Sequence, residues 1–333
     1  MAKTTKPNDS DLLLQLEGFR TLLGALEQHR PPPHQPRTVP EGVIVTRAPD
    51  AYSALHVIAE RLEPGLRKVF LDAVAGSLAA IDLERLAALL LAGQIDAAAA
   101  AGGIAQLTQG LGAVQPILEM GFKQGGQAAA SALTRGGLAI SFDLTNPRAV
   151  IWAGQYSGAL ITEIADETRA GIRTLIEAAF TDGLHPYDVA RRIRDWIGLT
   201  SRQQGAVARL ARALHEQGVD PEVVERRTQR YAASQLRYRA KLIARTETLA
   251  SSNYGQDELW AQAREQGLLS LARTKRVWLV TDDDRLDEDI CEPMEDQKVG
   301  LHEPFVTPQG RTLQVPPAHP NCRCTVGLEI AER

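Results

Sequence analysis

Cysteine is scarce in this chain: only three of its 333 residues are cysteines, and all three follow position 290. So few cysteines exclude a disulfide scaffold as the basis of the fold. Aromatic residues are also scarce, at 5%, whereas alanine is abundant, and this balance favours helices over sheet. Because hydrophobic (44%) and charged (23%) residues are near globular averages, we expect an ordinary packed core.

Long apolar segments are missing as well. The N-terminus, MAKTTKPNDSD, has no apolar stretch typical of a secretory signal, so we expect a cytosolic protein. Residues 97–118 carry no charge, but they contain four glycines, three glutamines and Pro116. Such content argues against a membrane span and indicates packed helix, so we expect no membrane partner. The net charge of −4 does not by itself indicate a nucleic-acid-binding protein.

The first 48 residues divide into two segments. Residues 11–30 place leucines and Phe19 at steps of three and four, which predicts an amphipathic helix within residues 1–30, with Ser10 as its N-cap. Three consecutive prolines then begin a stretch, residues 31–48, with the composition of an extended linker.

Residues 49–146 form an Ala-rich region in which the apolar pattern is helical. Glycines are expected to mark the ends of its helices. They stand at positions 93, 102, 103, 110, 112, 121, 125 and 126.

Residues 147–267 carry clearer helix signals. Prolines at 147, 186 and 221 predict three helix starts, the last of a helix that continues through Arg245 toward 267. Thr200 followed by Gln203 predicts a capping box at the start of another helix.

Residues 268–333 change character. Strands are predicted at 276–280, 312–315 and 324–330, separated by many prolines and glycines. The predicted fold is therefore α+β, mainly helical in its N-terminal and central regions, with a small turn-rich C-terminal module. Such a module buries little surface, which makes a covalent or metal staple useful.

The cysteines and one histidine supply candidate ligands for that staple. Thiolates and imidazoles are the ligands that zinc prefers, and four of them complete a tetrahedral structural site. The candidate ligands are Cys291, His319, Cys322 and Cys324. The single residue between Cys322 and Cys324 is tighter than usual zinc spacing. Reduced thiols packed in a core, or a disulfide from Cys291 to Cys322 or Cys324 formed after lysis, are the alternatives.

Positive charge is concentrated in residues 191–245, which hold 13 Lys or Arg against 5 Asp or Glu. A solvated helical face explains such a stretch, and so does a surface that meets DNA phosphates or an acidic protein. The candidate contacts are Arg226, Arg227, Arg230, Arg237, Arg239 and Lys241.

A series of short motifs then occurs in a recognisable order. It comprises Arg245-Thr246-Glu247, Asn253, Trp278, Asp284-Arg285, Gln297, Phe305, Pro317, His319 and Cys322-Arg323-Cys324. In this order the motifs resemble the Mu F-like phage head morphogenesis family, over residues 147–333. Two positions depart from the family: Glu288 stands where a first cysteine of a Cys-x-x-Cys pair is common, and Asp296 replaces a usual glycine.

The resemblance implies a minor capsid protein, not an enzyme. Such a protein is incorporated into the procapsid near the portal, with portal, capsid and scaffold proteins as partners and double-stranded DNA as a further contact. Its location would be the virion, and the host or lysogen cytoplasm during assembly. A stand-alone zinc-stapled nucleic-acid-binding module is the alternative.

A metal-dependent nuclease is a more remote reading. It would use the acidic residues between 282 and 289 together with His302 and His319. No Ser-His-Asp order, phosphate-binding loop or HExxH motif accompanies them.

Overall fold

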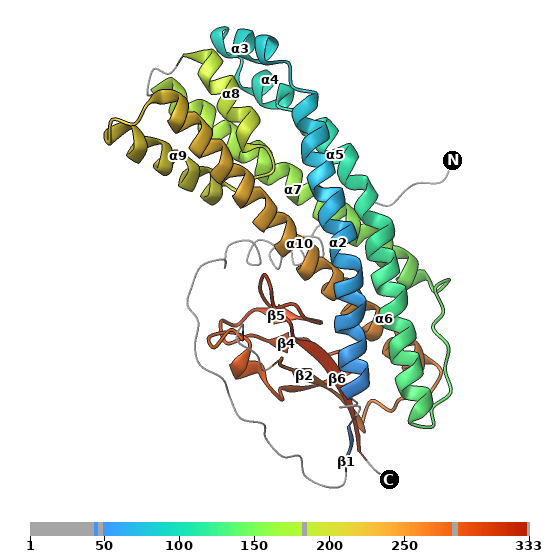
Figure 1. Cartoon of the computed structure of the whole chain (residues 1–333). Coiled ribbons are helices and arrows are strands. Elements are labelled where there is room, and N and C mark those ends of the chain that lie inside the picture. Colours follow the sequence, from blue (N-terminus) through green and yellow to red (C-terminus); the bar gives the residue numbers. More distant parts are fainter. Residues whose placement is uncertain (1–42, 46–48, 182–184, 282–285, 332–333) are drawn as a thin grey trace, which may run out of the picture. The chain divides into compact units, whose positions relative to one another are not determined.

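A computed structural model describes residues 43–45, 49–181, 185–281 and 286–331 (Figure 1). The predicted helix within residues 1–30 and most of the predicted linker lie outside the described residues. The α+β prediction is confirmed: the described chain is mostly helical, with a small antiparallel sheet region near its C-terminus.

Helices account for most of the described chain. They are α2 (Pro49–Ala79), α3 (Leu83–Leu91), α4 (Ile95–Ala101), α5 (Ile104–Leu111), the 3-10 turn η1 (Gly112–Val114), α6 (Gln115–Arg135), α7 (Pro147–Thr181), α8 (Pro186–Trp196), α9 (Ser201–Glu216) and α10 (Pro221–Glu265). The three predicted starts at prolines are confirmed. None of these helices has both the length and the apolar content that a membrane span needs.

The capping box at the start of α9 is also confirmed. The amide of Gln203 donates to the Thr200 hydroxyl, and the Gln203 side chain accepts from the Thr200 amide. Because both contacts are local, sequence alone could locate this helix start.

Glycines end only some of the helices. Gly93 and Gly103 adopt positive φ angles between helices, as predicted. The prediction that Gly121, Gly125 and Gly126 interrupt the chain is wrong, because all three lie inside α6. A Cβ added at Gly125 would stand 2.0 Å from the Ser252 carbonyl oxygen, so this glycine allows α6 to approach α10.

Two small antiparallel sheets contain the strands. The strands are β1 (Val43–Val45), β2 (Thr274–Leu279), β3 (Lys298–Gly300), β4 (Phe305–Val306), β5 (Thr312–Leu313) and β6 (Thr325–Ala331). One sheet has the order β1-β6-β2-β3, and β4 pairs with β5. The prediction of linker throughout residues 31–48 is wrong at β1, whose β-branched residues pair with the outer edge of β6.

The chain forms two compact units, each assembled from separate segments. Unit 1 contains the described residues within 43–64, 115–156 and 242–331, and unit 2 contains those within 65–114 and 157–241. The predicted division between 146 and 147 coincides with neither unit. Long helices bring distant segments together, which segment-by-segment sequence reading does not detect.

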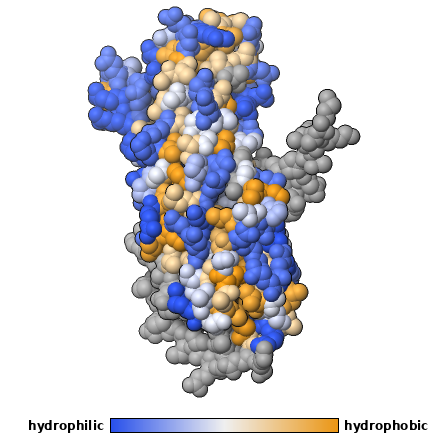
Figure 2. All heavy atoms as spheres, turned by 90° about the vertical axis from the view of Figure 1, so that its right-hand side faces the viewer, coloured by the Kyte–Doolittle hydropathy of each residue, from blue (hydrophilic) through white to orange (hydrophobic). Residues whose placement is uncertain are grey.

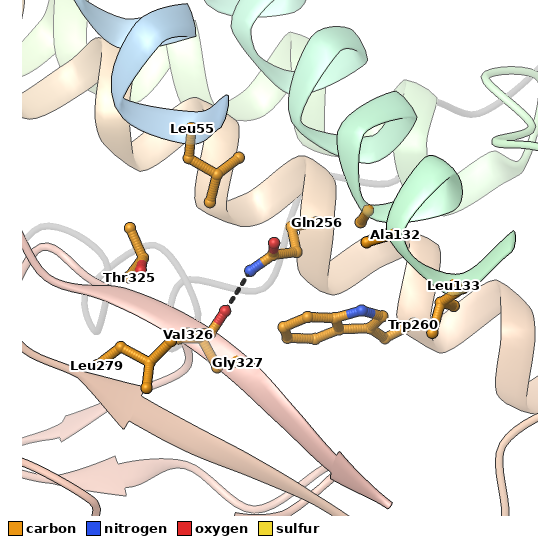
Figure 3. A pocket seen from close by; sticks show the side chains of 10 residues that line it. Leu55, Ala132, Leu133, Gln256, Trp260, Leu279, Thr325, Val326 and Gly327 are labelled. Atoms are coloured by element: carbon orange, nitrogen blue, oxygen red, sulfur yellow. Dashed lines mark hydrogen bonds between the residues drawn. The ribbon is translucent and has the colours of Figure 1, made fainter. Parts of the chain in front are cut away.

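Unit 1 holds the C-terminal sheet. Trp260 of α10 and Leu133 of α6 share a core with Trp278 and Val326 of the sheet. Gln256 of α10 donates its side-chain amide to the Val326 carbonyl oxygen, beside a small enclosed cavity (Figure 3). This packing fixes α10 over the sheet and the loops that leave it.

Unit 2 has a separate helical core. Leu86 and Leu90 of α3 pack with Ile172 and Ile176 of α7 and with Ile193 of α8. The first half of α10, which carries the basic stretch, belongs to this unit.

Candidate metal centre

Cys291 is held by a short turn after the acidic segment. Its amide donates to the Asp287 carbonyl oxygen at 3.0 Å, and the Asp287 carboxylate accepts from the amides of Asp289 and Ile290. The 3-10 turn η2 (Glu292–Met294) follows immediately. These local bonds leave the Cys291 side chain pointing into the unit 1 core, where it is only 1% exposed.

His319 and Cys322 come from the loop that precedes β6. This loop contains a cis peptide bond between Pro316 and Pro317 and a left-handed Asn321. The Cys322 amide donates to the His319 carbonyl oxygen at 3.1 Å, which turns both side chains toward the same interior.

These two loops bring the predicted ligands together. The Cys291 sulfur lies 2.9 Å from Nε2 of His319 and 3.6 Å from the Cys322 sulfur. The three ligand atoms all lie within 4.8 Å of one another, and all three residues are buried. Cys324, also buried, interacts with both other thiols. The cluster could hold a metal ion such as zinc.

The His319 ring is oriented as metal-bound histidines are. Its Nδ1 lies 2.9 Å from the Pro320 carbonyl oxygen, so Nδ1 carries the proton and donates. The Nε2 lone pair then faces Cys291. A second ring nitrogen fixed by a backbone carbonyl is the usual support of a histidine ligand.

The pKa values of the three thiols are shifted in different directions. Burial disfavours the Cys322 thiolate, but hydrogen bonds from Cys291 and Cys324 outweigh it and lower the pKa of Cys322. Donation to Cys322 raises the pKa of Cys291, and burial raises that of Cys324. The three cysteines are not joined by a disulfide. A cluster that already favours one thiolate is prepared for a cation.

Motif residues far apart in sequence also meet in unit 1. Arg245 donates to the Asn321 side-chain oxygen at 3.2 Å and to Glu63 at 3.1 Å. The Thr246 hydroxyl accepts from the Asn321 amide at 3.2 Å. Helix α10 therefore anchors the loop that carries His319.

A second group of motif residues surrounds β2. Trp278 packs edge-on against Phe305, with ring centroids 5.1 Å apart. The Gln297 side chain forms two 2.9 Å hydrogen bonds with the backbone of Val306. Pro317 is buried in the loop before β6, whereas Asp284 and Arg285 lie outside the described residues.

Three motif residues lie outside these groups. Nε2 of His56 donates to the Arg323 carbonyl oxygen at 3.0 Å, so Arg323 contributes through its backbone. Asn253 is buried on α10 and donates to the Leu249 carbonyl oxygen. Glu247 is fully buried; the Tyr156 hydroxyl donates to it at 2.6 Å, but burial still raises the pKa of Glu247 to about 8.

Arg276, which the sequence placed in a predicted strand without a role of its own, organises the small module. It is fully buried and donates to Asp257 at 2.7 Å and to the carbonyl oxygens of Glu303 and Gln314. Side chains alternate along β2, so Arg276 lies on the same face as the buried Trp278. This period of two is the sequence signal from which the burial of Arg276 could have been predicted.

The structure corrects one predicted phosphate contact. Arg239 is fully buried and bonds to Glu167 and to the Gly198 carbonyl oxygen, so it cannot meet a DNA backbone. Two residues along a helix turn about 200°, which takes Arg239 to the opposite side from Arg237. The other five candidates are exposed: Arg226, Arg227, Arg230, Arg237 and Lys241.

The described residues contain no carboxylate–histidine metal site of the kind that a nuclease would need. The group of potential ligands found there contains thiols and His319 but no carboxylate. His302 is exposed and lies against Arg264, with 2.7 Å between ring and guanidinium nitrogens.

No family model, curated protein or solved structure matches this chain. The resemblance over residues 147–333 therefore depends on the motif residues alone.

Proposed function

We propose that this chain is a minor capsid protein of the Mu F-like head morphogenesis family, incorporated into the procapsid near the portal. The observation that carries the proposal is the convergence of the motif residues. Arg245 and Thr246 hold Asn321, and Trp278 packs on Phe305, although these residues are separated by up to 76 positions. Motif residues that contact one another in a single module support membership of a family more strongly than short motifs scattered over a surface.

The backbone supports the resemblance at a position where the side chain departs from it. Asp296 has a φ of 60°, in the left-handed region that favours glycine. Glycine is the residue that the family usually has there. The backbone at position 296, just before Gln297, therefore has the conformation that the family's usual glycine would adopt without strain.

The proposal includes a structural zinc ion at the Cys/His cluster. Cys291, His319 and Cys322 are the nearest ligands, and Cys324 is the fourth. All four are buried, so the site has no open position for substrate and suits a structural ion. Two strands of only two residues each indicate why this module benefits from a staple.

A contact with genomic DNA is supported by a row of cations on α10. Arg226, Arg230, Arg237, Lys241 and Arg227 fall within about 100° of helical arc along about 22 Å. None of them forms an ion pair or hydrogen bond with any described residue. A row of exposed cations suits phosphates better than a protein interface, whose core is usually depleted of charge.

Co-assembly tests the proposed function. The tagged chain would be co-produced with the portal, scaffold and major capsid proteins of its own phage or prophage, and procapsids would be isolated by sedimentation. The chain should co-sediment at low copy number and should be lost when the portal is omitted. Procapsids that form normally without any bound chain would contradict the proposal.

A DNA-binding measurement distinguishes the proposed capsid protein from the alternative, a stand-alone nucleic-acid-binding module. If the purified chain binds duplex DNA but never associates with portal or procapsid, the stand-alone nucleic-acid-binding module becomes the better reading.

A further inference from the structure

An apolar groove runs along unit 1 between α6 and the first turns of α7. The groove has a volume of about 910 Å³, near the upper end of the roughly 300–1,000 Å³ that binding clefts usually have. Pro116, Met120, Lys123 and Gln127 line one wall at helical steps, and Val150 and Gly154 line the other. Met120 is 47% exposed and Val150 is 60% exposed. Figure 2 looks onto the side of Figure 1 that carries α6, where apolar residues reach the surface among polar ones.

Contacts of α6 with α10 and with α7 hold the walls of this groove in place. Gly121 and Gly125 allow α6 to lie against Ser251 and Ser252 of α10, closer than any side chain would permit. The Phe122 ring stacks on Trp152 with centroids 4.3 Å apart, which joins α6 to α7. A preformed groove of this kind costs a helical ligand little reorganisation.

Apolar residues near the groove are concentrated beyond what scattered exposure explains. Leu144, which lines the groove together with Met120 and Val150, is 37% exposed, and Ile151, the neighbour of Val150 in α7, is 53% exposed. A contiguous exposed apolar patch on a folded unit marks an interaction site.

We propose that the groove binds the chain's own N-terminal segment, residues 11–30, as an amphipathic helix. In this segment, apolar residues recur at steps of three and four, which is the spacing at which one face of a helix fills an apolar groove. They are Leu12, Leu16, Phe19, Leu23 and Leu26, at i, i+4, i+7, i+11 and i+14.

The connection is long enough for this docking. β1 pairs with β6 in unit 1, and β6 shares a core with the second half of α6. The groove lies along the first half of α6, within one helix length, about 31 Å. Residues 31–42 are twelve residues that span about 37 Å when extended. A tether of this length gives an effective concentration in the millimolar range, so the segment outcompetes a free partner of similar affinity.

Hydrogen exchange on the full-length protein tests the inference in both directions. Paired Met120→Asp and Val150→Asp substitutions change exposed groove residues, and they should raise amide exchange in residues 11–30 by roughly tenfold or more. Reciprocally, Leu16→Asp with Phe19→Asp should raise exchange along 115–127 and 147–155. Leu271→Asp, at an apolar residue 54% exposed elsewhere in unit 1, is the matched groove control. Thr21→Asp, on the opposite side of the predicted helix, is the control for the segment.

Three outcomes would overturn the inference. One is exchange of residues 11–30 at unfolded rates in the wild type. Another is equal protection in the groove variant and in the Leu271→Asp control. The third is protection that disappears on dilution, because the occupant would then be a second copy of the chain. Protection that is independent of concentration and is lost in both paired variants supports the docking of residues 11–30.

Discussion

The Cys291 sulfur lies 2.9 Å from Nε2 of His319, although the two residues are 28 positions apart in the chain. The contact joins the turn after the acidic segment to the loop before β6. None of the backbone hydrogen bonds among the described residues joins residues 287–294 to residues 315–323. A shared metal ion would supply the missing connection.

Zinc content is the first prediction. Freshly purified protein should contain about one zinc ion per chain, since a closed structural site is nearly stoichiometric. His319→Ala and Cys322→Ser should each abolish retention and lower the melting temperature. Elemental analysis together with thermal unfolding measures both effects.

Cys324→Ser identifies the fourth ligand in the same assay. If Cys324 binds the ion, this variant should lose affinity as Cys322→Ser does; if a water takes the fourth position, zinc should be retained. Less than about 0.2 zinc per wild-type chain would rule out the site.

The second prediction concerns the buried Arg276. Arg276→Met should destabilise the protein by about 3–5 kcal/mol, because it leaves the Asp257 carboxylate and two carbonyl oxygens without their donor. Lys275→Ala, at the exposed neighbour on β2, should change stability by about 0.5 kcal/mol or less. Denaturant unfolding of both variants gives the comparison, and similar losses would contradict the role of Arg276.

The third prediction is a pH dependence from Glu247. Its pKa is raised from 4.5 to about 8 in the folded protein, so the folded state binds a proton that the unfolded state has lost. Stability should therefore fall as pH rises from about 4.5 to 8, with a slope approaching about 1.4 kcal/mol per pH unit from this group. Glu247→Gln keeps an acceptor for Tyr156 and should flatten the profile. An unchanged slope in this variant would show that Glu247 is not the group responsible.

The fourth prediction tests the cation row on α10. Alanine at Arg226, Arg230 and Arg237 should weaken duplex DNA binding and reduce the slope of log affinity against log salt by about 2.7, or about 0.9 per phosphate contact. Alanine at the exposed Arg191, Arg209 and Arg212 removes the same charge elsewhere in unit 2. If both triple variants lose affinity equally, binding follows net charge and not this row.

The fifth prediction concerns the contact between α6 and α10. A Cβ at Gly255 would stand 1.9 Å from the Phe122 carbonyl oxygen, so Gly255→Ala should destabilise the protein by about 1–3 kcal/mol. Gly154→Ala, at a helical glycine with open space around it, should be neutral or stabilising by about 0.5–1 kcal/mol. Thermal unfolding that ranks the two variants in the reverse order would contradict this packing.

Sequence by itself determined the features that depend on neighbouring residues. The prolines at 147, 186 and 221 predicted helix starts because proline fits the first turn of a helix. The Thr200–Gln203 capping box closes within four residues. β2 and β6 were predicted from β-branched and aromatic content, to within two residues at each end.

Only the tertiary structure decided which side chains are buried and which distant loops meet. Gly125 had the sequence signature of a helix break, but it allows close packing inside α6 because Ser252 of α10 lies against it. Arg239 carried the same charge as Arg237, yet its side of α10 is occupied by Glu167. The pairing of Cys291 with His319 depends on long-range packing of two irregular loops, which no local periodicity encodes.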